Sequence, residues 1–253
     1  MVKILINGAN GRMGKKVREI AGYSDEITVV CGVDRVCDFS DDNFPVYDDI
    51  EKIKEKPDVV IDFSTASALS SVLSFATKKH TPVVLCSTGY TENDLLKINE
   101  ASKAVAIFRS ANMSIGVNVL INLVKKAATT LEGFDIEIVE KHHNKKIDAP
   151  SGTAMMIANG IKDVLPEKIF TYGRNGIVGN RNPDEIGIHA IRGGNIVGEH
   201  EVIFAGENEV ITLTHSAADR SVFASGAIRA AKFISNKQNG LFDMNDLLDN
   251  IND

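Results

Sequence analysis

The stretch Val2-Lys3-Ile4-Leu5-Ile6-Asn7-Gly8-Ala9-Asn10-Gly11-Arg12-Met13-Gly14 lies at the start of the chain. Its apolar, β-branched first half predicts a buried strand over residues 2–7, and the spacing after it predicts a helix over 11–22. A tight glycine turn between the two lets backbone amides and the positive end of the helix dipole meet a pyrophosphate. The spacing Gly8-x-x-Gly11-x-x-Gly14 departs from G-x-G-x-x-G, but the flanking strand and helix favour a dinucleotide site over a purely structural turn.

The same alternation of strand and helix continues through the first half of the chain. Apolar runs predict strands over residues 27–34, 58–63, 82–86 and 104–108, with helices over 66–79 and 92–103. Ser64 or Thr65 is the expected cap of the first of these helices. Because the runs are continuously apolar, the strands should be buried on both faces of a parallel sheet. The pattern predicts a Rossmann-type, doubly wound α/β domain with ligands at the carboxyl ends of its strands.

The pattern changes near Asn112, which predicts a second, α+β domain carrying an open mixed sheet. Here we expect helices over residues 115–131 and 153–165, strands over 135–140, 187–192, 196–205 and 209–215, and a long exposed loop over 173–185. Two final helices, over 221–236 and 240–250, should return to the first domain. The predicted division is therefore 1–113, completed by 220–253, for dinucleotide binding, and 114–219 for substrate binding.

Composition limits the possible partners. A formal net charge of -6 argues against a nucleic-acid surface, and no apolar run is long enough for a membrane span. The N-terminal apolar run is too short for a signal peptide. The cysteines (Cys31, Cys37 and Cys86) lack metal-ligand spacing and two lie in apolar runs, so we expect reduced thiols, no metal site and a cytoplasmic protein.

Several strand ends carry candidate cofactor residues. Asp34-Arg35 stands about 20 residues after the glycine turn, where an acid accepts the ribose hydroxyls of NAD and an arginine pairs with the 2′-phosphate of NADP. With both present, the choice between NADH and NADPH stays open. Phe63-Ser64-Thr65 and Cys86-Ser87-Thr88-Gly89 either line the nicotinamide ribose and phosphate channel or serve as helix caps. Ser110-Ala111-Asn112-Met113 is placed to offer an amide to the nicotinamide carboxamide.

The segment His142-His143-Asn144-Lys145-Lys146 is the second chemical signal. Hydride reduction of a carbon–nitrogen or conjugated bond leaves a group that needs a proton, which imidazole and a lysine can supply. On a strand, His142 and His143 face opposite sides and so should have different roles. The turn Pro150-Ser151-Gly152-Thr153 then offers amides and hydroxyls to a carboxylate at a helix N-terminus. The alternative is a solvated basic loop with Ser151 as an N-cap, but the convergence of donors favours a site.

These motifs together resemble those of the 4-hydroxy-tetrahydrodipicolinate reductase (dihydrodipicolinate reductase) family of the diaminopimelate–lysine pathway. Gly8–Gly14 resembles the family turn G-x-x-G-R-M-G, and 140–154 matches E-x-H-H-x-x-K-x-D-A-P-S-G-T-A throughout. The segments Arg192-Gly193-Gly194, Gly198-Glu199-His200 and His215-Ser216-Ala217 continue the match. Two positions depart from it: Cys86 replaces a glycine, which narrows the expected nicotinamide pocket, and Met113 replaces an aromatic residue.

The resemblance implies a role for each matching residue. His142 would donate or accept a proton, Lys146 would donate one, His143 would contact the substrate, and Ser151, Gly152 and Thr153 would hold its carboxylate. NADH or NADPH would contact Gly8, Ala9, Asn10, Gly11, Arg12, Met13, Asp34, Arg35, Phe63, Cys86, Ser87, Thr88, Ser110, Ala111, Asn112 and Met113.

The implied reaction gives hydride to a cyclic imine dicarboxylate, bound between the domains, with loss of its hydroxyl as water. The resemblance also implies a homotetramer joined through the sheet of the second domain. Two alternatives remain from the residues alone. One is another two-domain NAD(P)-dependent dehydrogenase for a small acid, which would need a different base or an activated cysteine. The other is a nucleotide-binding sensor that has lost catalysis, against which His142 and Lys146 argue.

Overall fold

The structure, a computed structural model, describes residues 1–37 and 44–252. The chain folds into two compact units, Met1–Ile115 with Arg220–Asp253, and Gly116–Asp219. Within the described residues, no helix has the length and apolar character needed to cross a membrane. The same residues hold no group of three or more His, Cys, Asp or Glu side chains that could bind a metal ion.

The first unit is built on a seven-stranded sheet whose neighbouring strands are all parallel. Its strand order is β12-β6-β5-β4-β1-β2-β3. The chain runs from β1 to β2 and β3 on one side, then crosses to β4 on the other side of β1, so the order reverses beside β1. The strands are β1 (Val2–Asn7), β2 (Ile27–Val33), β3 (Val46–Tyr47), β4 (Val59–Asp62), β5 (Val83–Leu85), β6 (Ala106–Arg109) and β12 (Gly240–Phe242).

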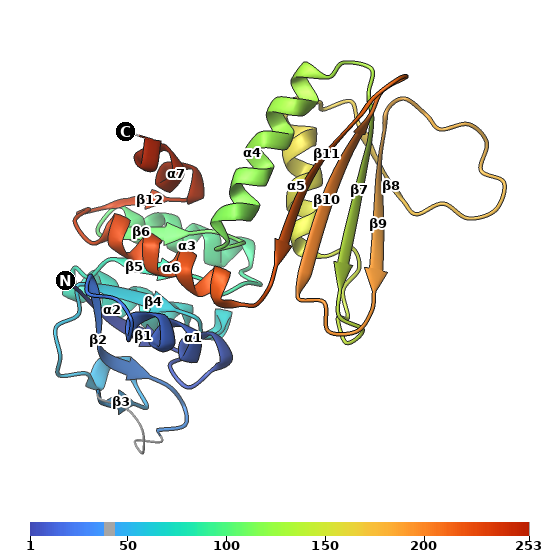
Figure 1. The fold of residues 1–253 in the computed structure, drawn as a ribbon. Coiled ribbons are helices and arrows are strands. Elements are labelled where there is room, and N and C mark those ends of the chain that lie inside the picture. Colours follow the sequence, from blue (N-terminus) through green and yellow to red (C-terminus); the bar gives the residue numbers. More distant parts are fainter. Residues whose placement is uncertain (38–43, 253) are drawn as a thin grey trace. The chain divides into compact units, whose positions relative to one another are not determined.

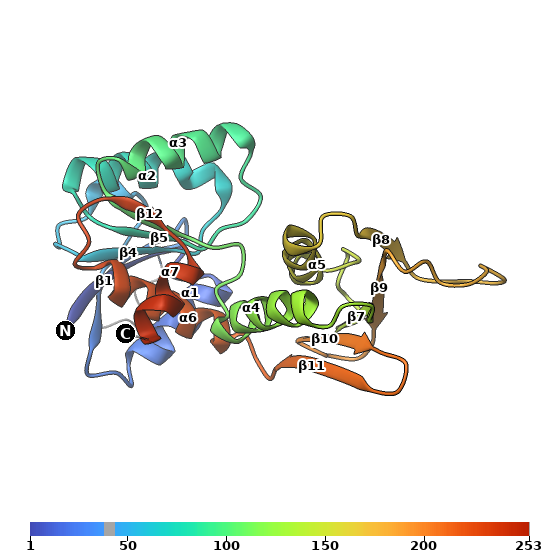
Figure 2. The same cartoon turned by 90° about the horizontal axis from the view of Figure 1, so that it is seen from above.

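Helices cover both faces of this sheet. Figure 2 shows α2 (Leu69–Lys79) and α3 (Glu92–Ser102) along one face, and α1 (Arg12–Ala21), α6 (Ser221–Ile234) and α7 (Met244–Asn252) along the other. Strand side chains alternate between two apolar cores, one under each helix layer, which is why the strands read as continuous apolar runs. The predicted doubly wound α/β fold is confirmed.

Two local predictions in this unit were wrong. Residues 240–242 form the edge strand β12, parallel to β6, and only then does α7 begin, whereas we expected one helix over 240–250. The strand depends on pairing with a distant segment, which local periodicity does not reveal. Neither Ser64 nor Thr65 caps α2: a 3-10 turn over Ala66–Ala68 precedes that helix, and Thr65 makes no capping hydrogen bond.

The second unit holds a five-stranded mixed sheet in the order β11-β10-β7-β9-β8. Strand β7 runs parallel to β9 and antiparallel to β10. As Figure 1 shows, α4 (Ile115–Thr130) and α5 (Gly152–Val164) pack on one face of the sheet. The predicted open mixed sheet is confirmed. Its strands are β7 (Asp135–His142), β8 (Ile169–Tyr172), β9 (Glu185–Arg192), β10 (Gly198–Ala205) and β11 (Val210–Ala217).

Strand β7 alternates strictly, and it extends two residues beyond the predicted 135–140. Ile136, Ile138, Glu140 and His142 are buried on the face covered by the helices. The residues between them are only half-buried, on the opposite face. A carboxylate and an imidazole therefore continue the apolar row at the end of this strand.

Candidate active site

The β1–α1 turn is shaped for close approach of a ligand to the backbone. Gly8 adopts φ 82°, and a Cβ there would lie 2.8 Å from the carbonyl oxygen of Phe63. A Cβ on Gly14 would lie 2.2 Å from the carbonyl oxygen of Gly8. Gly11 is the N-cap residue of α1 and makes no side-chain capping bond. The helix thus presents its positive end without a side chain in front of it, as a pyrophosphate requires.

A pocket of about 380 Å³ lies at the carboxyl ends of β1, β2 and β4. It is lined by five of the predicted cofactor residues, Gly8, Gly11, Asp34, Arg35 and Phe63. Asp48 and Asp49 line it too, and the sequence had not pointed to them. This is the edge of the sheet, beside the strand-order reversal, where doubly wound folds bind ligands.

Asp34 also shapes the turn itself. One carboxylate oxygen accepts from the backbone N–H of Asn10 at 2.9 Å, and the other accepts from that of Val36 at 3.4 Å. Asn10 donates its side-chain amide to the carbonyl of Val36 at 2.5 Å. Ala9, between Gly8 and Asn10, is fully buried, so its side chain faces the core and only its backbone faces the turn.

The other predicted cofactor residues do not line this pocket: Ala9, Asn10, Arg12 and Met13 lie in the β1–α1 turn and the start of α1, and the rest follow β5 and β6. Ser110 and Asn112 shape their own turn: the Ser110 hydroxyl donates to the Asn112 carbonyl at 2.8 Å, and the Asn112 side chain accepts from the N–H of Ser114 at 2.8 Å. The Met113 side chain is 3% exposed and lies in the core beneath α6 and α7. Burial, with the nearby Asp62, raises the pKa of the Cys86 thiol well above its usual range.

Sequence reasoning missed a buried carboxylate beneath the pocket. Asp62, fully buried at the end of β4, accepts from Asn7 Nδ2 at 2.8 Å, from Ser64 N at 3.1 Å and Oγ at 2.5 Å, and from Ser87 Oγ at 3.4 Å. These four residues are the Asp62 cluster, and they tie together the ends of β1, β4 and β5. All the donors are neutral, and burial raises the pKa of Asp62. The sequence offered one indication of this residue: Asp62 is the acid that ends the apolar run Val59-Val60-Ile61.

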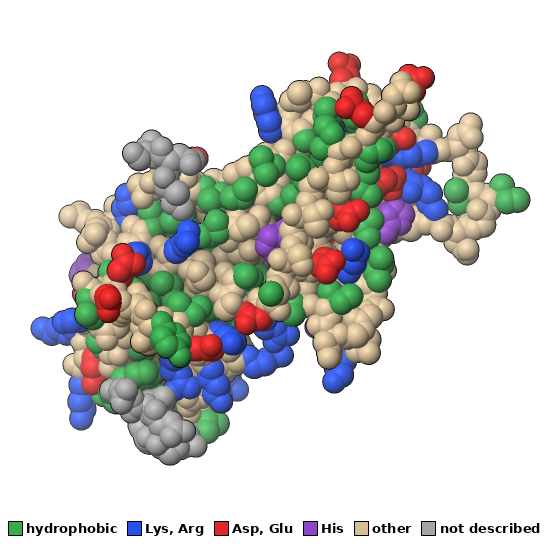
Figure 3. Space-filling model, in the orientation of Figure 1, with side chains coloured by type: hydrophobic (Ala, Val, Ile, Leu, Met, Phe, Trp, Pro, Cys, Tyr) green, Lys and Arg blue, Asp and Glu red, His purple; other side chains and the backbone are tan. Residues whose placement is uncertain are grey.

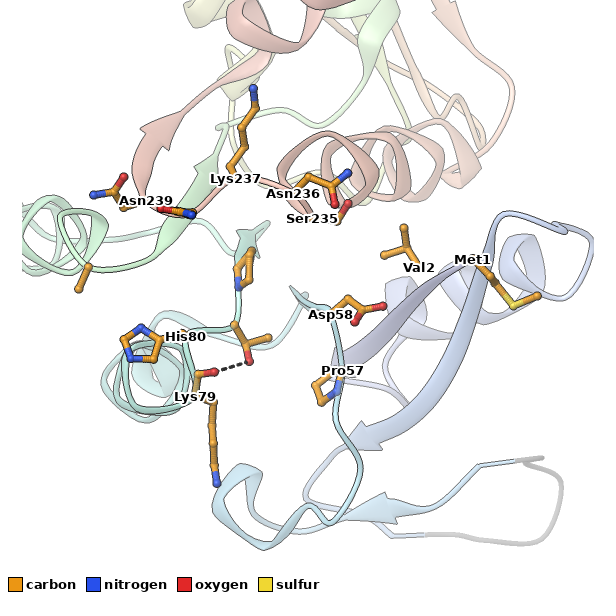
Figure 4. A pocket seen from close by; sticks show the side chains of 14 residues that line it. Met1, Val2, Pro57, Asp58, Lys79, His80, Ser235, Asn236, Lys237 and Asn239 are labelled. Carbon is orange, nitrogen blue, oxygen red and sulfur yellow. Dashed lines mark hydrogen bonds between the residues drawn. The ribbon is translucent and has the colours of Figure 1, made fainter.

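A larger hollow, of about 960 Å³, lies at the opposite, amino-terminal edge of the same sheet (Figure 4). Val2, Asp58 and Pro82 line it where three strands begin. None of the predicted site residues lines it. Two of its charged groups already have partners inside the protein: the Asp58 carboxylate accepts from the N–H of Lys3 at 2.8 Å, and the Lys237 ammonium lies 5.1 Å from the centre of the Phe233 ring. The smaller pocket is therefore the better cofactor site.

In the second unit, a buried carboxylate organises the basic segment. Glu140 is 0% exposed, and Arg192 donates to both of its oxygens, at 2.7 and 2.8 Å. His142 Nδ1 lies 2.6 Å from Oε2, and the Ser151 N–H donates to Oε1 at 3.0 Å. These four residues are the Glu140 cluster. Burial alone raises the pKa of Glu140, but donation from Arg192 and His142 outweighs burial and holds it below its usual value.

The turn that follows begins helix α5. The Ser151 hydroxyl is 2% exposed, accepts from the N–H of Ala154 at 3.1 Å and lies 3.1 Å from His200 Nε2. It is thus an N-cap, already engaged inside the protein. Gly152 is exposed and Thr153 half-buried in the first turn of α5, whose leading N–H groups precede the helical hydrogen-bond ladder.

The two other basic candidates lie in the loop that Glu140 closes. The N–H of Lys146 donates to the carbonyl of His143 at 3.1 Å, which turns the chain back after β7. Lys146 Nζ pairs with Asp148 Oδ1 at 2.8 Å, with its side chain 20% exposed. His143 is half-buried, and Lys145 is exposed. The structure therefore brings His142, His143, Lys146 and the Ser151–Thr153 turn together in one loop.

His200 and Arg192 are further site residues that sequence reasoning left without a role. The His200 ring packs edge-on against His142, with 5.2 Å between the ring centres. Burial, assisted by His142, lowers the pKa of His200 to about 4, so it is neutral at pH 7. Arg192 belongs to the family motif Arg-Gly-Gly and His200 to the family motif Gly-Glu-His. The missing signal was the pairing of β7 with β9 and β10, which sets Arg192 beside His142 and His200 beside Glu140.

Comparison with known families covers nearly the whole chain. The profile described as "Dihydrodipicolinate reductase, N-terminus" matches residues 2–113, and "Dihydrodipicolinate reductase, C-terminus" matches 116–248. The chain is 56% identical over 249 residues to a 4-hydroxy-tetrahydrodipicolinate reductase of Caldanaerobacter subterraneus, with 98% of each chain covered. It is 48% identical over 252 residues to the enzyme of that name from Clostridium novyi, again with 98% of each covered.

Solved structures share the fold. A dipicolinate-bound dihydrodipicolinate reductase from Paenisporosarcina superposes with a TM-score of 0.82 at 24% identity, covering 96% of this chain and 97% of that one. A probable dehydrogenase from Thermotoga maritima reaches a TM-score of 0.63 at 12% identity, covering 97% and 92%. At these identities the likeness concerns architecture alone.

Proposed function

The chain belongs to the dihydrodipicolinate reductase family, and from this membership and the two sites we propose how its residues reduce 4-hydroxy-tetrahydrodipicolinate to tetrahydrodipicolinate in lysine biosynthesis. The family assignment rests on both profiles and on relatives matched over 98% of the chain. It replaces the two alternatives, a different small-acid dehydrogenase and an inactive sensor. In this proposal the first unit binds the dinucleotide, and the second binds the substrate and forms the oligomer.

One observation supports the assignment of roles: Glu140 binds both His142 and the N–H of Ser151 at the start of α5, and Lys146 lies in the loop between them. The substrate is a dicarboxylate. Its carboxylate accepts from the N–H groups of Gly152 and Thr153, while His143 and the Lys146 ammonium face its charge. Ser151 contributes through its capping of the turn, because its hydroxyl is already engaged. His142 and Lys146 exchange protons with the ring of the substrate. When the substrate binds, the Lys146 ammonium leaves Asp148 and pairs with the substrate.

The first unit fits a nicotinamide dinucleotide. The backbone leaves no room for a side chain at Gly8 or Gly14, and in this proposal the turn over Gly8–Met13 faces the pyrophosphate. Asp34 and Arg35 line the pocket where the adenosine ribose would lie, so NADH and NADPH are both accommodated. Phe63, Cys86–Thr88 and Ser110–Met113 complete the site, with Met113 acting through its backbone because its side chain is buried. When bound, the reduced nicotinamide supplies the hydride.

The test is oxidation of NADH or NADPH, followed by absorbance, with freshly generated 4-hydroxy-tetrahydrodipicolinate. His142→Gln and Lys146→Ala should each lower kcat by about 100-fold or more, with the Kd for the cofactor unchanged. Lys145→Ala is the matched control, because Lys145 is an exposed neighbour of the same charge, and it should retain activity. No oxidation with either cofactor would sink the function, and equal losses of kcat and cofactor affinity would undo the roles.

We further assign the open face of the second sheet to a homotetramer. On that face Val139 and Ile203 are half-buried and Val210 is 61% exposed, and a second copy would cover these apolar side chains. Val139→Asp should shift the sedimentation coefficient from that of a tetramer to that of a smaller species. All three cysteines are free thiols, which favours a reducing compartment such as the cytoplasm.

A further inference from the structure

The carboxylate of Glu140 binds two parts of the proposed substrate site, His142 and the turn at Ser151. Glu140 Oε2 meets His142 Nδ1 at 2.6 Å, and Oε1 accepts from the N–H of Ser151 at 3.0 Å. Arg192 grips both oxygens, and its Nη2 also donates to the carbonyl of Asp148 at 2.7 Å. The side chains of Glu140 and Arg192 therefore hold His142, the Ser151 turn and the end of the loop that carries Lys146.

We propose that Glu140 is a positioning residue that keeps a proton on His142 Nδ1, so that Nε2 is the nitrogen that exchanges a proton with the substrate. This rests on the proposed function for the identity of the substrate and for the role of His142 in proton exchange. An ionised carboxylate accepts hydrogen bonds and cannot donate them, so the imidazole nitrogen facing it must carry the proton. The distance of 2.6 Å is that of a charge-assisted bond.

The proton then moves without rearrangement of the ring. As an imidazolium, His142 gives its Nε2 proton to the substrate and becomes the neutral form that still donates from Nδ1 to Glu140. Returning a proton from water to Nε2 restores the imidazolium. His142 thus needs no ring flip and no change of tautomer between turnovers.

The surroundings of Nε2 agree with this role. Gly198 on β10 faces the ring, and a Cβ on it would lie 3.1 Å from His142 Nε2, tighter than an ordinary contact. The glycine therefore leaves space beside that nitrogen. The other ring against His142 is His200, which burial keeps neutral at pH 7 and which bonds to Ser151 rather than to His142. Among the described residues, Glu140 is therefore the partner that fixes which nitrogen of His142 is protonated.

Strand β7 supplies a matched control. Glu137 lies on the opposite face and accepts from both Nη atoms of Arg174, at 2.8 and 2.9 Å, and from His189 Nε2 at 2.7 Å. It thus has the same kinds of partner, and Figure 3 shows acidic, basic and imidazole side chains gathered near the loop that carries Arg174. Glu137→Gln removes a comparable network without touching His142; because Glu137 lies on the face assigned to the tetramer, the sedimentation coefficient of this variant is compared with that of wild type.

The experiment compares Glu140→Gln with Glu137→Gln and wild type. Long-range 15N–1H correlation of the histidine rings at about pH 8 reports which nitrogen carries the proton in the neutral state. We expect Nδ1–H for His142 in wild type and Glu137→Gln, and a shift to Nε2–H in Glu140→Gln, whose amide donates to Nδ1. Turnover should fall by about 100-fold or more in Glu140→Gln, with cofactor Kd unchanged, and stay within about twofold in Glu137→Gln.

Gly198→Ala serves as the second variant if Glu140→Gln folds poorly. It should keep Nδ1–H on His142 and still lower kcat by about tenfold, because the methyl group crowds Nε2. A wild-type proton on Nε2, or unchanged tautomer and kcat in Glu140→Gln, would overturn the proposal. The ring measurement needs no substrate, so absence of turnover in wild type would count against the proposed function and leave the tautomer result to decide this inference.

Discussion

The Asp62 cluster and the Glu140 cluster each hold a buried carboxylate, but the hydrogen-bond partners of the two carboxylates differ in charge. Each carboxylate is 0% exposed, and each lies near the carboxyl end of a central strand and ties down the turns of a candidate site. Asp62 is met only by neutral donors, and burial raises its pKa. Glu140 is met by a guanidinium and an imidazole, and these lower its pKa despite burial. The charge of the partners, and not burial, decides the state of each acid.

The difference matches the proposed task of each unit. A dinucleotide site needs turns held in place, for which neutral hydrogen bonds suffice. A proton-exchanging site needs a fixed charge that selects one imidazole nitrogen and remains ionised throughout turnover. Substitutions in and beside each cluster test whether the two carboxylates differ in this way.

Removing the cation from the Glu140 cluster should have the largest effect on stability. Arg192→Met leaves Glu140 buried without its bidentate partner, which typically costs about 3–5 kcal/mol. The free energy of unfolding in urea measures the loss. Arg174→Met is the control and should cost less, because Glu137 keeps Arg181 at 3.0 Å and His189 at 2.7 Å. Equal losses in the two variants would remove the distinction drawn for Glu140.

The pH dependence of stability should come next in size. Burial lowers the pKa of His200 from 6.5 to about 4, so between these values the unfolded chain binds the proton more readily than the folded one. Stability should therefore fall as pH drops from about 6.5 to about 4, by roughly 3 kcal/mol. His200→Gln keeps a donor for Ser151 and should flatten this part of the curve. Wild-type stability that is level over the same range would show that His200 is not held neutral in the folded protein.

Asp62→Asn should have the smallest effect. An asparagine oxygen can still accept from Asn7 and Ser64, and its amide can donate to Ser87, so the change in unfolding free energy should stay within about 1 kcal/mol. The pKa of Asp62 is raised in the folded protein, whereas the pKa of Glu140 is lowered. Its contribution is complete at low pH and is lost as pH rises through the folded value, so the variant should lose less stability than wild type as pH rises. A loss of several kcal/mol would show that Asp62 needs its charge.

The sequence revealed elements whose pattern is local and missed contacts made by pairing. The β1–α1 turn, the buried strands and the loop 173–185 follow from residues close together in the chain. The edge strand β12 was mistaken for a helix because β6, which pairs with it, lies far away in the sequence. Glu140 was part of a recognised motif, but its partner Arg192 is 52 residues further along, so no spacing indicated their contact. Ser151 was assigned to the substrate, while the structure shows its hydroxyl engaged in capping α5.

The most direct test sets the two carboxylates side by side: kcat for cofactor oxidation with 4-hydroxy-tetrahydrodipicolinate, measured on Asp62→Asn and Glu140→Gln, with cofactor Kd determined for both. We expect Asp62→Asn to keep kcat within about threefold of wild type, and Glu140→Gln to lose about 100-fold with unchanged cofactor affinity. Equal losses of kcat in both variants, or full activity in Glu140→Gln, would contradict this expectation.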